Sequence, residues 1–503
     1  MARADTFRDA PPKASAMLES LRGLGYSAAT AIADIIDNSI AAHATTVDIS
    51  FVWRGSDSCI VVSDDGYGMT EPTLDRAMRL GELNPLERRE SGDLGRFGLG
   101  LKTASFSQCR RLTVASQRDG SLSCMHWDLD ILANSLDGRW RLMEGAGIGA
   151  AEFLESLLSR RSGTVVVWNA LDRIITPGST EQDFLDLIDR VERHLAMVFH
   201  RYLSGPAPTL SIKVNGRAIA PWDPFLASHM ATWRSPLERI PSEAGTIDIQ
   251  CFVLPHRDRL SAREYEEAAG PDGWTAQQGF YVYRNRRLLV AGSWLGLGSA
   301  RPWTKEETHR LARIRLDIPN TADVAWNIDV RKSRARPPVV LRERLTRLAE
   351  DTRARARRVF VHRGQQTTSS SAGPVMPAWK AVRNADSLQY RIDSDHPAVQ
   401  MVLENAGPLR AEIQAMLRII EETVPVQRIW LDTAESREVA RNSFSLASPE
   451  EVTAVVNTLY RSLVLRKGMA PGLARARLLA TEPFNQYPDI VSSLPDEADK
   501  MES

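Results

Sequence analysis

The order of helix-like and strand-like segments in roughly the first 200 residues constrains the fold of this chain most strongly. An apolar helical repeat runs over residues 28–42, where isoleucines recur on one face, and a second amphipathic helix is expected over 182–202. Short apolar runs typical of strands lie between them, at 47–52, 59–63, 111–116 and 164–168. This pattern predicts a mixed α/β domain over residues 1–204.

A Gly/Pro break and a Ser/Gly/Pro linker divide the rest of the chain. The break, at 205–208, opens a strand-rich region over 205–340, in which Asn215-Gly216 predicts a two-residue hairpin turn. A basic helix and the linker fill 341–380, and apolar patterns typical of helices follow over 381–503. We therefore expect an α/β protein of the α+β sandwich kind, with a second α/β domain and a mainly helical C-terminal region.

Charge and cysteine usage exclude several classes of protein. The charges of the 63 basic and 63 acidic residues cancel, so any binding of nucleic acid must use a local patch of basic residues. The four cysteines form no CxxC pair, which argues against a disulfide framework or a zinc site and fits a reducing compartment. Because there is no secretion signal and no apolar run near the roughly 18–20 residues that span a bilayer, we expect a cytoplasmic protein with no membrane contact.

The helical segment 31–39 carries the first candidate site. Asp34 and Asn38 are four residues apart and therefore share one face of the helix. A carboxylate there can orient or deprotonate a water molecule, and the Asn side-chain oxygen suits Mg²⁺, which prefers oxygen ligands. The solvated face of an ordinary amphipathic helix is the alternative interpretation.

The second candidate site follows a strand, where the apolar run ends in Asp64-Asp65-Gly66-Tyr67-Gly68-Met69. Glycines permit a tight turn and allow a ligand to approach the backbone closely. A buried Asp at a strand end can accept a hydrogen bond from an exocyclic amine such as adenine N6. An ordinary Asp-Gly turn after a strand is the alternative.

The third candidate site is a glycine-rich stretch over 92–103, in which Gly95, Gly98 and Gly100 precede Lys102-Thr103. Glycines let backbone N–H groups approach phosphates, and a helix that begins there adds its dipole. Lys102, one of only eight lysines, would add a positive charge. The spacing is neither that of a P-loop nor that of a dinucleotide fingerprint, so the stretch alone is a weak signal.

These segments, followed by Ser162-Gly163-Thr164 before a strand, together resemble the motifs of the GHKL ATPase superfamily. That superfamily includes gyrase, the ninety-kilodalton heat-shock chaperones, histidine kinases and MutL. The resemblance covers about residues 15–200. It implies a Bergerat fold, in which a mixed sheet backed by helices holds ATP and Mg²⁺ under a mobile lid.

The resemblance also implies a role for each matching residue. Asp34 takes the position of the general base, Asn38 that of the Mg²⁺ ligand and Asp64 that of the adenine contact. Residues implied around the base and the phosphates are Gly66, Gly68, Met69, Gly95, Gly98, Gly100, Lys102, Thr103 and Thr164. Many members carry Glu where this chain has the shorter Asp34, so slow turnover and ATP binding without hydrolysis both stay open.

Within the superfamily, Gly95–Thr103 is most similar to the MORC branch and its prokaryotic relatives. Tyr283–Leu289 resembles a strand-turn phrase of the transducer domain in MORC and MutL-type proteins. Residues 326–332 resemble the loop that delivers a lysine to the ATP γ-phosphate, which implies that Lys332 senses that phosphate and couples the two domains. One more solvated cation in a basic run is the alternative for Lys332.

The basic run over 331–363 carries twelve Lys or Arg against three acidic residues. Screening limits the reach of these charges to about 8 Å, so the run acts locally even on a neutral protein, and it suits the phosphates of DNA. Arginines that pair with acidic neighbours or with a partner subunit are the alternative.

The resemblance implies an ATP-dependent molecular clamp. In such a clamp ATP closes the lid and promotes a homodimer, and hydrolysis reopens it. We expect DNA as the client, in chromosome handling or antiphage defence, and protein partners for the C-terminal domain. A heat-shock-type protein chaperone and a scaffold that binds ATP without hydrolysis are the alternatives.

Overall fold

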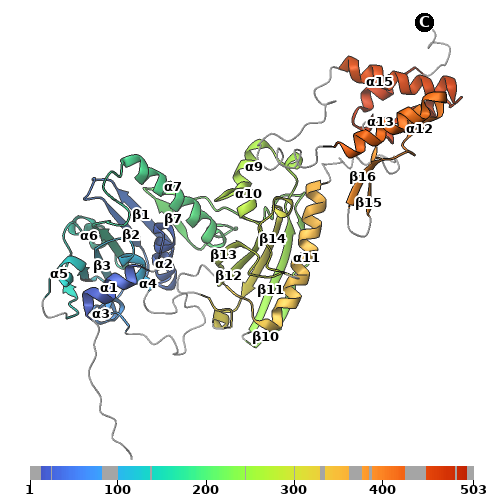
Figure 1. Ribbon diagram of the computed structural model, residues 1–503. Coiled ribbons are helices and arrows are strands. Elements are labelled where there is room, and N and C mark those ends of the chain that lie inside the picture. The colour runs from blue at the N-terminus through green and yellow to red at the C-terminus, as the bar shows by residue number, and fades with distance from the viewer. Residues whose placement is uncertain are drawn as a thin grey trace, which may run out of the picture. The chain divides into compact units, whose positions relative to one another are not determined.

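The computed structural model describes twelve stretches of the chain (Figure 1). They are 13–23, 25–81, 100–135, 139–243, 245–298, 301–323, 325–328, 335–361, 377–383, 388–424, 449–481 and 484–495. The chain divides into two compact units, Met1–Gln365 and Gln366–Ser503, and each is described by itself.

The first unit begins with an eight-stranded sheet in the order β5-β4-β3-β6-β2-β1-β7-β8. Its strands are β1 (Thr46–Val52), β2 (Cys59–Asp64), β3 (Arg111–Arg118), β4 (Ser121–Asp128), β5 (Met143–Glu144), β6 (Gly163–Asn169), β7 (Ser211–Val214) and β8 (Arg217–Ala218). Every neighbouring pair is antiparallel except β1 and β7, which are parallel. The four strands expected from the sequence are confirmed as β1, β2, β3 and β6.

Helices cover both faces of this sheet. On one face α2 (Ala28–Ala41) packs against α4 (Gly100–Phe106) and α7 (Glu181–Val198), and the shared core holds Ile32, Val62 and Leu195. On the other face α6 (Ala151–Leu158) packs on β3 and β6. Alternate residues of a strand point to opposite sides of the sheet, so the same strands supply apolar side chains to both faces. The remaining helices of this part are α1 (Ala14–Arg22), α3 (Glu71–Met78), α5 (Leu129–Ala133) and α8 (His200–Leu203).

The first sheet continues beyond the domain boundary that the sequence predicted at residue 204. Strand β7 pairs with β1, and its Ile212 and Val214 are each 1% exposed within the first core. The Gly/Pro segment 205–208 is therefore a loop inside the domain, and the sheet ends at Ala218. The hairpin between β7 and β8 is confirmed: Asn215 and Gly216 both have positive φ, 46° and 80°, as a type I′ turn requires.

A second sheet follows in the same unit, in the order β10-β11-β14-β12-β13, with β9 beside β11. Its strands are β9 (Trp233–Arg234), β10 (Glu238–Ser242), β11 (Gly245–Val253), β12 (Gly279–Arg284), β13 (Arg287–Ser293) and β14 (Ala312–Ile318). The basic helix that the sequence predicted is α11 (Val339–Val361), which packs on β11 and β14 (Figure 1). Shorter elements complete this part: η1 (Arg257–Arg259), α9 (Ala262–Ala269), α10 (Gly273–Ala276), η2 (Glu307–His309) and η3 (Asn320–Asp323).

The second unit is mainly helical, as the sequence predicted. It contains α12 (Pro397–Asn405), η4 (Gly407–Leu409), α13 (Arg410–Glu422), α15 (Pro449–Arg461), a π-helical turn (Ser462–Arg466), α16 (Pro471–Leu479), η7 (Phe484–Gln486) and α17 (Pro488–Ser492). Its hairpin of β15 (Trp379–Arg383) and β16 (Leu388–Ile392) was not expected. The core is formed mostly by α15 and α16, with Val456, Tyr460 and Ala474 each 0% exposed.

Candidate functional site

Helix α2 carries the first pair of candidate residues. A reciprocal capping box between Ser27 and Thr30 begins the helix, and the following isoleucines bury one face. Asp34 faces the interior and is 5% exposed, whereas Asn38 is exposed to solvent. The two side chains therefore share the helix but lie in different environments, one buried and one reachable from solvent.

The buried carboxylate of Asp34 has two partners that the sequence did not reveal. The Tyr26 hydroxyl donates to Asp34 Oδ2 at 3.1 Å, and a guanidinium nitrogen of Arg287 lies 3.6 Å from Asp34 Oδ1. Arg287 Nε also donates to both carboxylate oxygens of Asp37, at 3.1 Å each. Asp37 is 2% exposed, so this helix buries two carboxylates beside one arginine from the second sheet.

Asp64, at the end of β2, connects α2 to the sheet. The Ser39 hydroxyl on α2 donates to Asp64 Oδ2 at 2.8 Å, and the Gly66 backbone N–H donates to Oδ1 at 3.0 Å. In the antiparallel register Asp64 stands opposite Thr164 on β6. Burial raises the pKa of Asp64, and the hydrogen bonds from Ser39 and Gly66 oppose that rise because they favour the carboxylate.

The glycine turn after Asp64 is packed against neighbouring strands. Gly68 has φ +70°, and a Cβ there would lie 1.9 Å from the Gln117 carbonyl oxygen, so only glycine fits. The next residue, Met69, donates its backbone N–H to Ser116 Oγ at 2.8 Å. Ser116 Oγ also shares a 2.9 Å hydrogen bond with Thr164 Oγ1, so the turn and Thr164 are held by the same side chain.

Helix α4 begins at Gly100 and places Lys102 and Thr103 in the interior. Lys102 is 2% exposed and donates to the Ala77 carbonyl, in the last turn of α3, at 2.8 Å. Burial lowers the pKa of Lys102 to about 8. The expected phosphate contacts Gly95 and Gly98, and the expected sensor Lys332, lie outside the described residues.

Three of the sequence motifs thus meet around α2. Asp34 and Asn38 stand on the helix, Ser39 bonds the helix to Asp64, and Thr164 lies across the strand pair from Asp64. Helix α4, with Lys102, packs directly against α2. The structure brings these segments together, although more than a hundred residues separate the first from the last.

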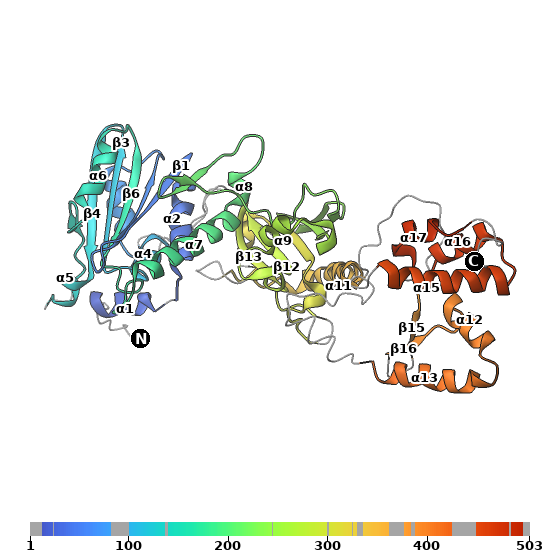
Figure 2. The same ribbon diagram turned by 90° about the horizontal axis from the view of Figure 1, so that it is seen from above.

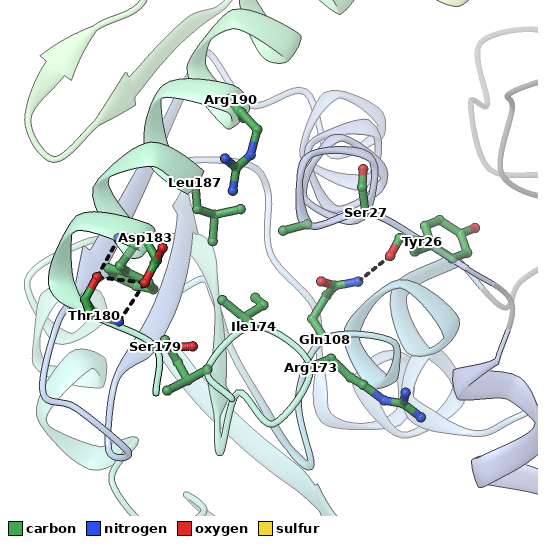
Figure 3. Close-up of a pocket in the computed structure, with 13 residues that line it drawn as sticks. Tyr26, Ser27, Gln108, Arg173, Ile174, Ser179, Thr180, Asp183, Leu187 and Arg190 are labelled. Atoms are coloured by element: carbon green, nitrogen blue, oxygen red, sulfur yellow. Dashed lines mark hydrogen bonds between the residues drawn. The ribbon is translucent and has the colours of Figure 1, made fainter. Parts of the chain in front are cut away.

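A separate cavity of about 270 Å³ lies near the start of α2 (Figure 3). Its lining includes Tyr26, Ser27, Gln108, Arg173, Thr180 and Arg190. Figure 3 shows Gln108 reaching toward Tyr26, whose backbone carbonyl it contacts at 3.1 Å. None of the candidate residues Asp34, Asn38 and Asp64 lines this cavity, so it is not the site assembled above.

Some arginines of the basic helix α11 contact other residues of the first unit. Arg344 donates to Glu238 on β10 at 2.7 Å. Arg353 is 9% exposed and lies over the rings of Trp294 and Trp303, 4.8 and 4.6 Å from their centroids. Arg353 also lies 3.9 Å from a carboxylate oxygen of Glu306, so both arginines have acidic neighbours, as the alternative interpretation expects. Arg357 and Arg358 are exposed near the end of the helix.

Among the described residues, no cluster of three or more His, Cys, Asp or Glu side chains is arranged to hold a metal ion. The described helices likewise include none with the length and apolar character that crossing a membrane requires.

Residues 26–164 match the family described as histidine kinase-, DNA gyrase B-, and HSP90-like ATPase, which spans the segment from Tyr26 to Thr164. A curated relative, ATPase morc-1 of Caenorhabditis elegans, is 29% identical over 96 residues. That stretch is 19% of this chain and 11% of the relative, so the similarity covers only a small part of either protein. Both findings agree with the resemblance inferred from the motifs: residues 26–164 match the GHKL ATPase family and are similar to part of a MORC ATPase.

Proposed function

We propose that this chain is a Mg²⁺-dependent ATPase that closes as a clamp on DNA, in chromosome handling or antiphage defence. The observation that carries the proposal is the meeting of three motifs around α2, with Asp34 and Asn38 on the helix and Asp64 and Thr164 on adjacent strands. The family match over 26–164 supports ATP as the ligand.

The residues at the strand ends suit an adenine ring. Asp64 is 6% exposed and Thr164 is 8% exposed, so hydrogen bonds there are little weakened by water. The Ser39 hydroxyl donates to Asp64 Oδ2 and the Gly66 N–H donates to Oδ1. A carboxylate has about four acceptor sites, so Asp64 can also accept a hydrogen bond from an amino donor. We propose that the Asp64 carboxylate accepts a hydrogen bond from the exocyclic amine of adenine and that the Thr164 hydroxyl contacts the base beside it.

The residues on α2 suit the triphosphate end. Mg²⁺ keeps several waters and needs few protein ligands, so the exposed oxygen of Asn38 together with phosphate oxygens suffices. When bound, the ion neutralises charge on the phosphates. Asp34, held by Tyr26 and Arg287, is the proposed acceptor for the proton of the attacking water.

A scaffold that binds ATP without hydrolysing it is the second candidate. It is favoured by Asp34 itself, which is one methylene shorter than Glu and has both oxygens in contact with protein groups. Both candidates require nucleotide binding, so they differ only in turnover.

The DNA-binding part of the proposal rests on the run 331–363, which carries a net formal charge of +9. Arg344 pairs with Glu238 and Arg353 lies over tryptophan rings, so we take the exposed Arg357 and Arg358 as candidate phosphate contacts on the helix. ATP-driven homodimerisation would bring two such runs together on one DNA molecule.

Calorimetry with ATP and ADP, followed by a hydrolysis assay, tests the proposal. We expect binding at micromolar to millimolar ATP, and a higher Mg²⁺ requirement for hydrolysis by the Asn38→Ala variant. Wild-type protein that binds no adenine nucleotide at millimolar concentration would overturn the ATPase assignment. Binding without turnover would select the scaffold.

The DNA arm compares hydrolysis and DNA binding at low and high salt. The double variant Arg357→Ala/Arg358→Ala should weaken DNA binding and flatten its salt dependence. The matched control is Arg347→Ala, whose side chain already pairs with Glu343 at 2.8 Å. Equal DNA affinity for all three proteins would remove this helix from the DNA contact.

A further inference from the structure

We infer that Arg287 is a positioning residue for Asp34, through which the second sheet controls ATP hydrolysis in the first domain. The inference rests on the proposed function, because it gives a regulatory contact to the proposed base. Arg287 is the first residue of β13, in a different sheet from every other residue of the candidate site.

The guanidinium of Arg287 is shared between two carboxylates on one helix. Its Nε donates to both oxygens of Asp37 at 3.1 Å, and another of its nitrogens lies 3.6 Å from Asp34 Oδ1. Asp34 and Asp37 are three residues apart on α2, so their side chains project from the same side of the helix. All three side chains are buried, with exposed fractions of 4%, 5% and 2% for Arg287, Asp34 and Asp37.

Burial makes this contact consequential. Removing one partner from a buried ion pair is strongly destabilising, so Arg287 stabilises the two Asp side chains and they stabilise it. On Asp34 the contacts come from two domains: Tyr26 of the first domain binds Oδ2, and Arg287 of the second sheet lies at Oδ1. The direction in which the Asp34 carboxylate points therefore depends on where the second sheet is docked.

The hairpin that carries Arg287 is itself fixed to the first domain. Its turn residues Asn285 and Arg286 both have positive φ, 46° and 69°, which makes a tight two-residue turn. The Tyr202 hydroxyl, on α8, donates to the Asn285 carbonyl, and Arg286 lies over the Tyr202 ring at 5.0 Å. Figure 2 shows α7 extending toward this hairpin, and α7 packs against β13.

Two further groups surround the Arg287 guanidinium. It lies 5.9 Å from the centroid of the Phe199 ring, at the end of α7. Burial and the Arg287 charge lower the pKa of His194, on α7, to about 4, so the imidazole is neutral and adds no competing cation near pH 7. The charged groups that contact one another here are Arg287, Asp34 and Asp37, and the charges of Arg201 and Arg286 lie nearby at Tyr202.

A movement of the second sheet would therefore reach the proposed base directly. Displacement of a reacting group by about 1 Å can cost on the order of 100-fold in rate. Docking of the β12–β13 hairpin holds Asp34 in its working orientation, and undocking releases it. Asp64 and Thr164, on β2 and β6, are not in contact with Arg287, so binding of the adenine ring there should not require the contact between Arg287 and Asp34.

The experiment compares three variants of the full chain for nucleotide binding and for hydrolysis. Arg287→Met should bind ADP within about threefold of wild type while kcat falls at least tenfold, on the scale expected for a misplaced base. Arg287→Lys should recover only part of the rate, because a single ammonium cannot reach both carboxylates as the planar guanidinium does. Arg239→Met, on the edge strand β10 of the same sheet, where the side chain is 73% exposed, is the matched control and should keep the wild-type kcat.

The variant Arg287→Met removes a cation from beside two buried carboxylates, so its folding is checked by thermal unfolding. If it does not fold, the double variant Arg287→Met/Asp37→Asn removes one of those charges and is used in its place, with the same loss of kcat expected. A folded variant of either kind that hydrolyses ATP at the wild-type rate would overturn the inference. Loss of ADP binding in a folded variant would overturn it too, since Arg287 would then be a binding residue.

The same experiment separates this inference from the proposed function. Wild-type protein that binds ATP but shows no turnover would refute both the inference and the hydrolysis step, and would leave nucleotide binding intact. Wild-type protein that binds no nucleotide would refute the proposed function itself.

Discussion

Asp64 on β2 and Thr164 on β6 are direct neighbours across two antiparallel strands, although they belong to the second and the last of the sequence motifs. Ser39, on α2, donates to Asp64 at 2.8 Å, and Ser116, on β3, shares a 2.9 Å hydrogen bond with Thr164. One helix and three strands thus hold a carboxylate and a hydroxyl side by side, which is the arrangement proposed to bind adenine.

Replacement of Asp64 tests that arrangement. Asp64→Asn presents an amide where the base needs an acceptor, so we expect ATP and ADP binding to weaken by about 1–3 kcal/mol each, the scale of one unsatisfied buried polar group. Thr164→Val should cost less, because it removes only a hydroxyl. Isothermal calorimetry measures both variants, and wild-type affinity in Asp64→Asn would place the base elsewhere.

The proposed base predicts a separation of binding from turnover. Asp34→Ala should still bind ATP but hydrolyse it roughly 100-fold more slowly or worse, because the water loses its proton acceptor. Asp34→Glu should keep or raise the rate, since it restores the longer side chain of many relatives. Single-turnover kinetics distinguish these outcomes, and an alanine variant as fast as wild type would assign the base to another residue.

Lys102 predicts a pH dependence of nucleotide affinity. Its pKa is lowered to about 8 by burial, so the folded protein loses this charge as the pH rises through 8. If Lys102 binds the phosphates, ATP affinity should be constant below pH 7 and fall above pH 8, by up to about tenfold per pH unit.

The control for this pH dependence is a pair of lysine variants. Lys102→Met should bind ATP weakly at every pH and lose the slope. Lys213→Met, on β7, should keep the wild-type profile. A wild-type affinity that does not change between pH 7 and 9 would show that the charge of Lys102 does not contribute to phosphate binding.

Lys332 predicts a coupling between the two domains that depends on the γ-phosphate. An ammonium at that phosphate distinguishes ATP from ADP, so Lys332→Ala should bind ADP normally, lose most ATPase activity and fail to compact or dimerise with ATP. Small-angle scattering with a non-hydrolysable ATP analogue measures the response. If the Lys332→Ala variant compacts or dimerises with the analogue as wild type does, Lys332 is only one more cation of the basic run and does not sense the γ-phosphate.

Local sequence patterns determined the elements of this protein and the identity of its ATPase domain. The apolar repeat of α2, the strands around the candidate site and the basic helix α11 were all predicted, because side-chain periodicity and turn residues act over a few positions. The hairpin turn at Asn215-Gly216 was predicted for the same reason, since its positive φ angles suit those two residues. The order of the motifs, read together, was enough to indicate a GHKL domain.

Tertiary structure alone decided which residues from distant segments meet. Strand β7 joins the first sheet because Ile212 and Val214 complete its core, and no local signal at 205–208 could show that. In the sequence, Arg287 was only one residue of a strand-turn phrase. In the folded protein it is buried and contacts Asp34 and Asp37, although arginine usually lies at the surface. Such ion pairs depend on how two sheets dock, and docking is set by the summed burial of many side chains, which short sequence patterns do not encode.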